Sequence, residues 1–260
     1  MAEPPPIPSY PDLAGKVAVV TGGSRGIGAA TCRLLGRQGA LVAVNGRDEA
    51  AIENVVCEIC AAGGQAIGVS ADCTDLRAVE GMRETIERRL GPADVLVACA
   101  GGFGAYTPAH LITEEEWHSV IDSNLTATYL TVKSFLPGMI ERRAGSIVTM
   151  ASNAARFLDI LTTASYAAAK AGIVMFSRHV AKEVGQHGVR VNCVAPATVL
   201  SERVHRIMSE ERQREVAALA PLGRLGAPED VALATLFLAS DSSAWLTGVT
   251  LDVAGGRIML

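Results

Sequence analysis

Short runs of apolar residues, many of them β-branched, alternate with longer amphipathic segments along almost the entire chain. Seven runs predict strands, at residues 16–22, 40–46, 65–72, 93–101, 145–152, 189–196 and 248–253. Strands that are apolar on both faces need cover on both sides, and parallel strands need a crossover segment between them. The alternation therefore predicts an α/β fold, a single Rossmann-type, doubly wound sheet of seven parallel strands with helices on both faces.

The segments between these runs predict the helices. We expect helices from about residue 26, from about residue 48, over 75–90, 114–135 and 228–240, and around the stretch "SYAAAK", with a polar helical region over 201–218. The proline-rich stretch before the first strand can continue neither a helix nor a sheet ladder. Residues 1–12 are therefore expected to form a flexible arm, and residues 13–260 a single domain.

Composition and charge argue against several classes of partner. The 260 residues are 49% hydrophobic and 19% charged, as in a globular chain. The net charge is −4 and the sequence has no basic run, so nothing favours nucleic acid or an anionic membrane as a partner. The sequence shows no signal-peptide pattern, and no apolar run reaches the roughly 18 residues that a membrane span needs. We expect a soluble, cytoplasmic protein.

The six cysteines are scattered through apolar or helical contexts, which suits reduced thiols. Cys57 and Cys60 have i, i+3 spacing within a predicted helix, but no second pair or neighbouring histidine completes a zinc site. We therefore predict no metal site and interpret most of the cysteines as small core residues.

The first predicted strand leads into the glycine-rich stretch "TGGSRGIG", residues 21–28. Three of its glycines have the spacing G-x-x-x-G-x-G before a helix, where missing side chains let the backbone turn tightly and approach a pyrophosphate. The pattern predicts a dinucleotide site with contacts from Gly22, Ser24, Arg25, Gly26, Ile27 and Gly28. Two alternatives stay open, an ordinary glycine-rich turn and the G-x-S-x-G elbow of a serine hydrolase with Ser24 as nucleophile. The hydrolase lacks an evident base among the five histidines.

The end of the second strand bears on the choice between NAD and NADP. In NAD-specific sites an acidic residue there binds the adenine ribose. Here the position is Gly46, and the next residue is Arg47, whose guanidinium suits a phosphate. With Arg25 as a second cation, we predict a preference for NADP(H) over NAD(H), against the alternative that both arginines are simply solvated. Asp48 is interpreted as a helix N-cap rather than as an NAD-selecting acid.

The stretch "SYAAAK" places Tyr166 and Lys170 four residues apart, on one face of a helix. With the glycine loop, Asp72 after the third strand, "CAGG" after the fourth, Asn124 and Ser152, this pair resembles the short-chain dehydrogenase/reductase family over nearly all of residues 13–256. The family includes 3-oxoacyl-carrier-protein reductases and glucose dehydrogenases. Singly, each of these residues has an ordinary structural explanation, but their joint order favours catalysis.

The resemblance implies a role for each of the four candidate catalytic residues. Tyr166 is the general acid/base, Lys170 binds the nicotinamide ribose and supports Tyr166, Ser152 orients the substrate carbonyl, and Asn124 holds a proton-relay water. These roles agree with general chemistry, because a neighbouring ammonium favours the phenolate form of a tyrosine and hydroxyl donors stabilise negative charge on a carbonyl oxygen.

The resemblance also implies further cofactor contacts near the ends of later strands, namely Asp72, Cys73, Ala100, Gly101, Pro196, Val199 and Ser201. The sequence departs from the family pattern in three respects. Cys99 stands where an asparagine is usual. Ala197 stands where glycine is usual. The family's cofactor-contacting threonine corresponds to Ser201, with Thr198 as the alternative position. The interval from Ser152 to Tyr166 is one residue longer than in many relatives.

The substrate wall is expected from residues 102–106, 154–161 and 199–207, which supply Phe103, Tyr106, Phe157, Leu158 and Leu161. Such a lining favours an apolar or bulky ketone, although the same residues can merely pack a lid, and residues 201–218 form a candidate mobile cover.

These features predict a dinucleotide-binding catalytic domain over residues 13–260, an NADPH-dependent oxidoreductase that reversibly reduces a ketone to a secondary alcohol. The alternative enzyme is an NAD(P)-dependent sugar or steroid alcohol dehydrogenase. A non-catalytic NADPH-binding regulator is the alternative from another class, but both Tyr166 and Lys170 are present. The partner is a small-molecule carbonyl or alcohol, and the resemblance implies a homotetramer or a dimer.

Overall fold

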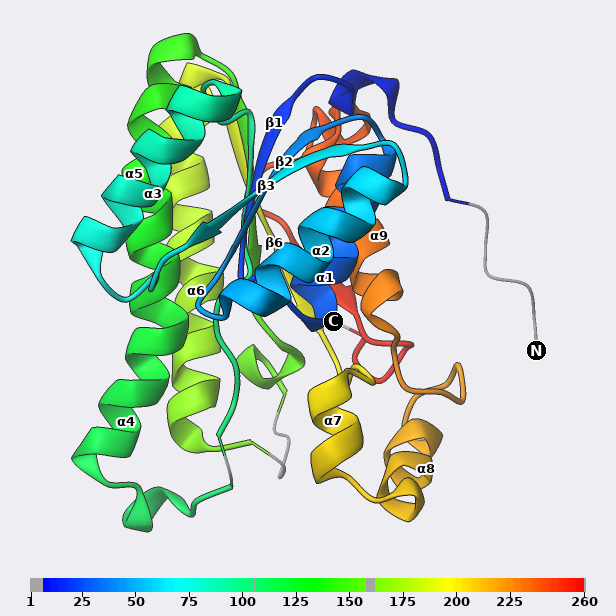
Figure 1. Ribbon diagram of the computed structural model, residues 1–260. Coiled ribbons are helices and arrows are strands. Elements are labelled where there is room, and N and C mark those ends of the chain that lie inside the picture. Colours follow the sequence, from blue (N-terminus) through cyan, green and yellow to red (C-terminus); the bar gives the residue numbers. More distant parts are fainter. Residues whose placement is uncertain (1–6, 105, 158–161, 260) are drawn as a thin grey trace.

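The sheet has the strand order β3-β2-β1-β4-β5-β6-β7, and all neighbouring strands are parallel (Figure 1). The structure is a computed structural model that describes residues 7–104, 106–157 and 162–259. The order is that of a doubly wound dinucleotide-binding sheet, so the predicted fold class is confirmed. The strands are β1 (Val17–Thr21), β2 (Leu41–Gly46), β3 (Gln65–Ser70), β4 (Val95–Ala98), β5 (Gly145–Met150), β6 (Val189–Pro196) and β7 (Thr250–Val253).

Helices cover both faces of the sheet (Figure 1). One face carries α1 (Gly26–Arg37), α2 (Glu49–Ala61) and α9 (Pro228–Ala239). The other carries α3 (Leu76–Leu90), α5 (Ala127–Arg142) and α6 (Ala164–Val184), with α4 (Glu114–Ile121) preceding α5. The short helices α7 (Glu202–Ile207) and α8 (Glu210–Ala218) lie beyond the carboxyl ends of the strands.

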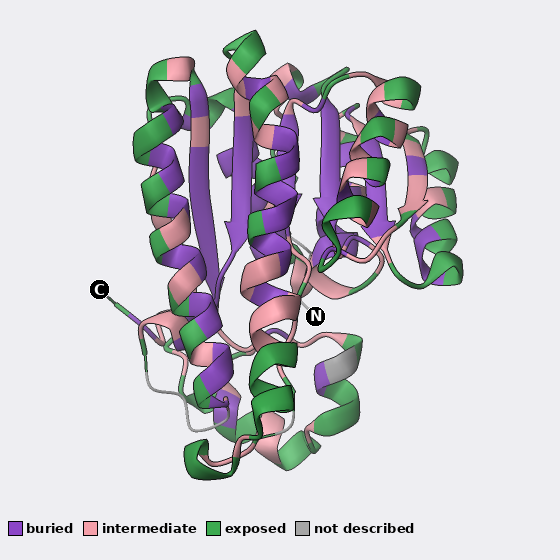
Figure 2. Cartoon of the chain, turned by 90° about the vertical axis from the view of Figure 1, so that its left-hand side faces the viewer, coloured by how far each residue is buried: buried purple, intermediate pink, exposed green. Residues whose placement is uncertain are grey.

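Consecutive strand residues face the two helical layers in turn. Val19 is fully buried in the core shared with α3 and α5, and Val20 is fully buried in the core shared with α1 and α9. Figure 2 shows the same burial along the central strands. Burial on both faces explains why the strands read as nearly continuous apolar runs in the sequence.

The helix predicted over residues 114–135 is longer and interrupted. A π-helical stretch (Asp122–Thr126) separates α4 from α5, and α5 continues through Pro137 to Arg142. Pro137 is exposed, so water can bond the carbonyl that its missing N–H leaves free. Phe135 and Met139, on either side of it, are buried in the core. Their packing outweighs the cost of the proline.

The predicted polar helical region over residues 201–218 is two helices. Met208 has an extended backbone after α7, and the Ser209 hydroxyl then accepts a hydrogen bond from the Arg212 N–H, which caps α8. A serine in this position favours a new N-cap over continuation of the preceding helix.

The flexible arm over residues 1–12 and the single domain over 13–260 stay predictions. Among the described residues of the arm, the Tyr10 N–H donates to Gln38, whose amide donates to the Pro8 carbonyl, and Asp12 accepts from the Asp241 N–H. Residues 8–12 therefore contact the rest of the chain.

Within the described ranges, no helix is both long enough and apolar enough to span a membrane.

Candidate active site

The carboxyl ends of the parallel strands meet at one edge of the sheet, which faces down in Figure 1. The predicted site residues follow these ends. The glycine loop follows β1, Ala100 and Gly101 follow β4, Ser152 follows β5, and Ser201 lies beyond β6. Because β1, β4, β5 and β6 are adjacent, the topology gathers residues that are far apart in the sequence.

Close backbone contacts shape the glycine loop. Gly22 and Gly26 have φ angles of +65° and +51°, in the left-handed region. A Cβ on Gly22 would lie 2.9 Å from the Ala100 Cα, and a Cβ on Gly28 would overlap the Gly22 carbonyl oxygen. The N-cap residue of α1, Arg25, makes no side-chain capping bond, so the first N–H groups of α1 suit an anion.

Thr21 joins the glycine loop to the segment after β4. Its hydroxyl oxygen accepts hydrogen bonds from the backbone N–H groups of Cys99 and Ala100, at 3.2 and 3.3 Å. Cys99 packs against the core under α1 and the core under α9, and burial raises the pKa of its thiol to about 11. A neutral thiol therefore fills apolar space where the family pattern has an amide.

The end of β2 lies beside the glycine loop. A Cβ on Gly46 would lie 2.7 Å from the Ser24 Oγ, so Ser24 takes up space that an acidic side chain at position 46 would need. The Asp48 carboxylate accepts from the Ala51 N–H at 3.1 Å, which confirms it as the N-cap of α2. This bond, followed by the hydrogen bond from Arg25, lowers the pKa of Asp48.

Arg47 is the more accessible of the two predicted phosphate-binding arginines. Its side chain is 81% exposed, and its Nη1 lies 3.9 Å from the Asp72 Oδ2. Asp72 also accepts hydrogen bonds from the N–H and hydroxyl of Thr74, which hold its pKa below the ordinary value. The long separation from Asp72 leaves the Arg47 guanidinium accessible to a second anion.

Cys73 has a buried side chain. Its thiol donates to the Asn45 Oδ1, and burial raises its pKa to about 11. Only the backbone of Cys73 is therefore available for the predicted cofactor contact.

The chain after β6 returns to the glycine loop. Val199 is buried in the cluster against which Ile27 packs. The Ser201 Cβ lies 3.7 Å from the position of a Cβ on Gly26, and the Ser201 hydroxyl caps α7. The structure thus brings two residues predicted beyond β6 to the predicted pyrophosphate loop.

Helix α6 carries Tyr166 and Lys170 against the end of β5. The Thr163 hydroxyl caps the helix by accepting from the Tyr166 N–H. Lys170 is 4% exposed, and its ammonium donates to the Met150 carbonyl at 2.8 Å and lies 5.5 Å from the centre of the Tyr166 ring. Tyr166 is 8% exposed, and the Phe103 ring meets it edge-on with centroids 6.0 Å apart.

Burial tunes the charge of Lys170. Desolvation lowers the pKa of its ammonium to about 8, and the neighbouring Cys99 and Cys193 oppose this effect. Lys170 is therefore charged at neutral pH, but only slightly so above pH 9.

Ser152 begins the turn after β5. It is buried, its hydroxyl donates to the Asn153 Oδ1 at 3.1 Å, and its oxygen accepts from the Ala154 N–H at 3.2 Å. These two bonds fix the hydroxyl next to the strand end whose carbonyl holds Lys170. Asn153 is thus a site residue that the sequence analysis did not single out, although its polar side chain directly after Ser152 was a usable signal.

Asn124 clamps the loop that carries Phe103. Its Oδ1 accepts from the Gly102 N–H at 3.1 Å, and its Nδ2 donates to the Gly102 and Val120 carbonyls at 2.9 Å. Its own carbonyl accepts from the Thr128 hydroxyl. The amide of Asn124 is therefore used within the chain, and its place in the π-helical stretch orients it towards Gly102.

The predicted substrate wall is described in part. Phe103 contacts Tyr166, whereas Tyr106 and Phe157 are exposed. Leu158 and Leu161 lie outside the described residues.

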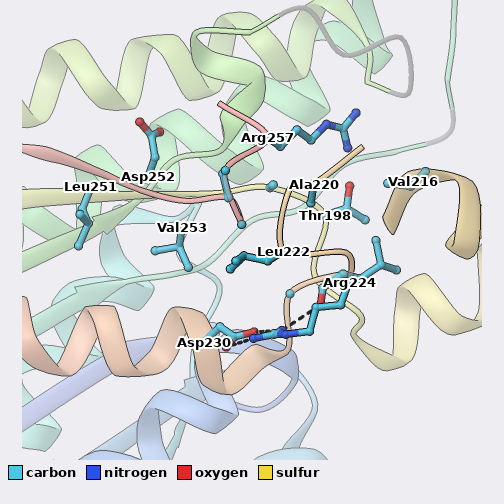
Figure 3. Close-up of a pocket in the computed structure, with 16 residues that line it drawn as sticks. Thr198, Val216, Ala220, Leu222, Arg224, Asp230, Leu251, Asp252, Val253 and Arg257 are labelled. Atoms are coloured by element: carbon cyan, nitrogen blue, oxygen red, sulfur yellow. Dashed lines mark hydrogen bonds and ion pairs between the residues drawn. The ribbon is translucent and has the colours of Figure 1, made fainter. Parts of the chain in front are cut away.

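A cavity of about 390 Å³ opens farther along the same edge, beyond β6 and β7 (Figure 3). Arg224 and Asp230 face each other in its wall, with two hydrogen bonds of 2.5 and 2.8 Å. None of the four predicted catalytic residues lines it, and Ala197 and Thr198 are its link to the chain after β6. The candidate catalytic residues therefore lie outside this cavity.

Two other chemistries gain no support from these positions. The described hydrogen bonds do not link Ser24 to a histidine, and His118 and His179 face glutamates of their own helices. Within the described ranges, no three His, Cys, Asp or Glu side chains are grouped to hold a metal ion.

The comparisons with known proteins agree with this arrangement. A family model described as short chain dehydrogenase matches residues 16–212. The chain is 36% identical over 252 residues to the 3-oxoacyl-(acyl-carrier-protein) reductase FabG of Vibrio harveyi, with 96% of this chain and 100% of that one covered. It is 38% identical over 250 residues to FabG of Chlamydia pneumoniae, with 94% and 97% covered.

Solved structures show the same fold. A 3-oxoacyl-(acyl-carrier-protein) reductase from Brucella melitensis has a TM-score of 0.94 at 31% identity, with 100% of this chain and 98% of that one covered. A structure of such a reductase from the same organism with bound NAD has a TM-score of 0.92 at 31% identity, with the same coverage.

The glycine loop predicts the effect of a single methyl group. Gly28→Ala places a Cβ against the Gly22 carbonyl and must deform the loop, so we expect the dissociation constant for a nicotinamide dinucleotide to rise by roughly tenfold or more. The control is Gly81→Ala on the exposed face of α3, where a Cβ meets nothing within 4 Å. Fluorescence titration measures both, and equal affinities would contradict the loop assignment.

The lowered pKa of Lys170 predicts a pH dependence of stability. Between pH 8 and 10.5 the unfolded chain keeps a proton that the folded chain has lost, so stability rises with pH in this window. Relative to Lys170→Met, the free energy of unfolding should rise by about 3 kcal/mol. Urea denaturation across this range, without cofactor, measures it. Parallel curves for the two proteins would show that Lys170 titrates normally.

Proposed function

This chain belongs to the short-chain dehydrogenase/reductase family, and from that premise we propose that it is an NADPH-dependent reductase of ketones that forms secondary alcohols reversibly. It is an NAD(P)-dependent oxidoreductase acting on C=O and CH–OH groups. The observation that carries the proposal is the buried Tyr166 and Lys170 pair beside the turn of Ser152, at the strand edge that also holds the glycine loop.

The residues present fit a nicotinamide dinucleotide. The glycine loop offers a backbone that Cβ atoms would obstruct and a helix start without a side-chain cap. The loop would hold the pyrophosphate, with Val199 and Ser201 closing the site from the β6 side. Lys170 would bind the nicotinamide ribose. When bound, the cofactor supplies the hydride in reduction and accepts it in oxidation.

Lys170 supports the proposed proton transfer by Tyr166. Its ammonium is anchored on the Met150 carbonyl and lies 5.5 Å from the Tyr166 ring centre, so its charge favours the phenolate of Tyr166 over the phenol. In the proposed reduction, Tyr166 donates its hydroxyl proton to the oxygen of the substrate carbonyl. In the reverse direction it accepts that proton as the general base.

Ser152 orients the carbonyl. Its hydroxyl oxygen is held between Asn153 and Ala154. Rotation of its one proton from the Asn153 Oδ1 to the substrate oxygen would make it a donor where negative charge grows during reduction. Asn124 supports this arrangement because its amide clamps Gly102 beside Phe103. A proton-relay water at Asn124 would have to share the backbone carbonyl with the Thr128 hydroxyl, since the side-chain amide is engaged with Gly102 and Val120.

The preference for NADPH rests on charge and space at the end of β2. Gly46 provides no carboxylate, and Ser24 occupies the adjacent space. Arg47 is exposed and Arg25 is close by in the loop. The reductase of Brucella melitensis with bound NAD shows that relatives of this fold also bind the other dinucleotide.

For the substrate, we propose a ketone with an apolar substituent next to the carbonyl, because Phe103 packs against Tyr166. The names of the relatives favour 3-oxoacyl thioesters as the first substrates to test. Sugar and steroid ketones test the alternative alcohol dehydrogenases. Oxidation of NADPH at 340 nm against these three classes separates the alternatives, and no turnover of any ketone would contradict the proposal.

We also propose a homotetramer. Two exposed apolar regions support it, one on α4 to α6 with Trp117, Tyr129 and Met175, and one along β7 and the chain around it with Leu222, Leu251 and Met259. Patches of this kind favour protein interfaces. Light scattering should give four times the chain mass of 27.1 kDa, and a mass of one chain would contradict the proposal.

Tyr166→Phe removes the transferable proton and leaves the ring that packs on Phe103. We expect kcat to fall by about two orders of magnitude or more, because general acid catalysis contributes this much. NADPH affinity, measured by fluorescence titration, should stay near that of the unsubstituted protein. Near-normal turnover by Tyr166→Phe would contradict the assignment of Tyr166 as the acid.

Arg47→Asp reverses the charge at the proposed phosphate contact. The new carboxylate repels a 2′-phosphate and can accept hydrogen bonds from ribose hydroxyls, so the ratio of kcat/KM for NADPH to that for NADH should fall by roughly tenfold or more. Arg37→Asp, at the far end of α1, is the control. An unchanged ratio for Arg47→Asp would refute the predicted cofactor preference.

A further inference from the structure

An ion pair connects the turn after Ser152 to the last strand of the sheet. Arg156 follows this turn, and its guanidinium forms a hydrogen-bonded ion pair with the Asp252 carboxylate on β7. The two side chains are 21% and 20% exposed, less than in any other ion pair of the described residues. This pair therefore interacts more strongly than the solvated pairs of the surface.

The ion pair spans the last strands of the sheet. The chain leaves β5 with the Ala151 N–H bonded to the Val194 carbonyl of β6, and Asp252 is paired in register with Ala195. Arg156 therefore reaches from the turn above β5 across β6 to β7. On this face β6 presents the small side chains of Cys193 and Ala195, which leave room for a guanidinium.

The turn has little support of its own. It is a single 3-10 turn, Asn153–Ala155. Its backbone hydrogen bonds run from the Ala155 N–H to the Ser152 carbonyl at 3.0 Å and from the Arg156 and Phe157 N–H groups to the Asn153 carbonyl at 3.0 and 2.9 Å. So short a turn is marginal without outside contacts. The ion pair ties its last residues to the sheet, four residues after the Ser152 hydroxyl.

The charges around this pair belong to the same site. Burial raises the pKa of the Cys193 thiol. Hydrogen bonds with Thr149 and the Ala151 backbone oppose that rise most, and the positive charges of Lys170 and Arg156 oppose it further. Both cations therefore act on one face of β6, and the Asp252 carboxylate neutralises one of them. Arg156 also keeps a buried Nε without a partner in the described structure, which costs stability. The pair is thus poorly explained as a stabilising contact alone.

We propose that Arg156 and Asp252 are positioning residues that hold Ser152 in its reactive orientation through the turn between them. The inference rests on the proposed role of Ser152. Arg156 itself contacts neither substrate nor cofactor in this account. Its effect on the reaction passes through the position of the serine hydroxyl.

A double-mutant cycle tests the proposal with kcat for the best ketone as the readout. Arg156→Met should lower kcat about tenfold, since small displacements of a reacting group have effects of this size. In the Ser152→Ala background the same substitution should cause no further loss, because the group that it positions is gone. Asp252→Asn should behave like Arg156→Met, and Arg156→Lys should retain most of the activity.

Controls separate positioning from general damage. Arg83→Met on α3 removes an arginine of similar burial, at 25% exposure, which is paired with Glu80 and Glu87, and should leave kcat unchanged. Cofactor affinity should change little in Arg156→Met. The thermal midpoint should fall, because the Asp252 carboxylate loses its partner, so kcat is measured well below that midpoint. If that variant is too unstable, the double variant with Arg156→Asp and Asp252→Arg, which swaps the two charges, should restore folding and part of the activity.

Two results would overturn the proposal. One is a kcat for Arg156→Met within about twofold of the unsubstituted protein, and the other is an equal loss with and without Ser152. If Ser152→Ala alone retains full kcat, the proposed role of Ser152 is wrong. That outcome is distinct from a cycle in which Ser152 matters but Arg156 acts independently of it.

Discussion

The hydrogen bond from the Lys170 ammonium to the Met150 carbonyl connects the parts of the site. A buried ammonium needs a partner, and the end of β5 supplies one. The bond holds α6 against that strand, with Tyr166 one turn before Lys170 and Ser152 two residues after Met150. Because these positions are fixed relative to the sheet, the proposed acid, its supporting cation and the carbonyl-orienting hydroxyl need little reorganisation for reaction.

The glycine loop imposes the second constraint. Its backbone passes so close to α1 and to the segment after β4 that Gly22 and Gly28 have no room for a Cβ. The same closeness leaves space and uncapped N–H groups for a pyrophosphate. Cys99 fits this account, because its neutral thiol packs between two apolar cores directly behind the loop, where an amide would need further hydrogen-bond partners.

Much of this arrangement follows from local patterns. Apolar runs predicted the strands, and the places of the glycine loop and of Ser152 follow from strand ends that meet at one edge. Other features depend on contacts between distant segments. The residues around Pro137 do not predict that α5 continues through it. The helix continues because the packing of Phe135 and Met139 on the sheet offsets the cost of the proline. The Arg156 and Asp252 pair joins positions 96 residues apart, which no local pattern reveals.

In the proposed reaction, hydride goes from the cofactor to a carbonyl carbon while Tyr166 protonates the oxygen. The most direct test uses NADPH that carries deuterium at both positions of the reactive carbon of the nicotinamide, with the best ketone as substrate. We expect an alcohol with one deuterium on its carbinol carbon, added to one face of the carbonyl only, as seen by mass spectrometry and NMR. An alcohol with hydrogen from solvent at that carbon would contradict it.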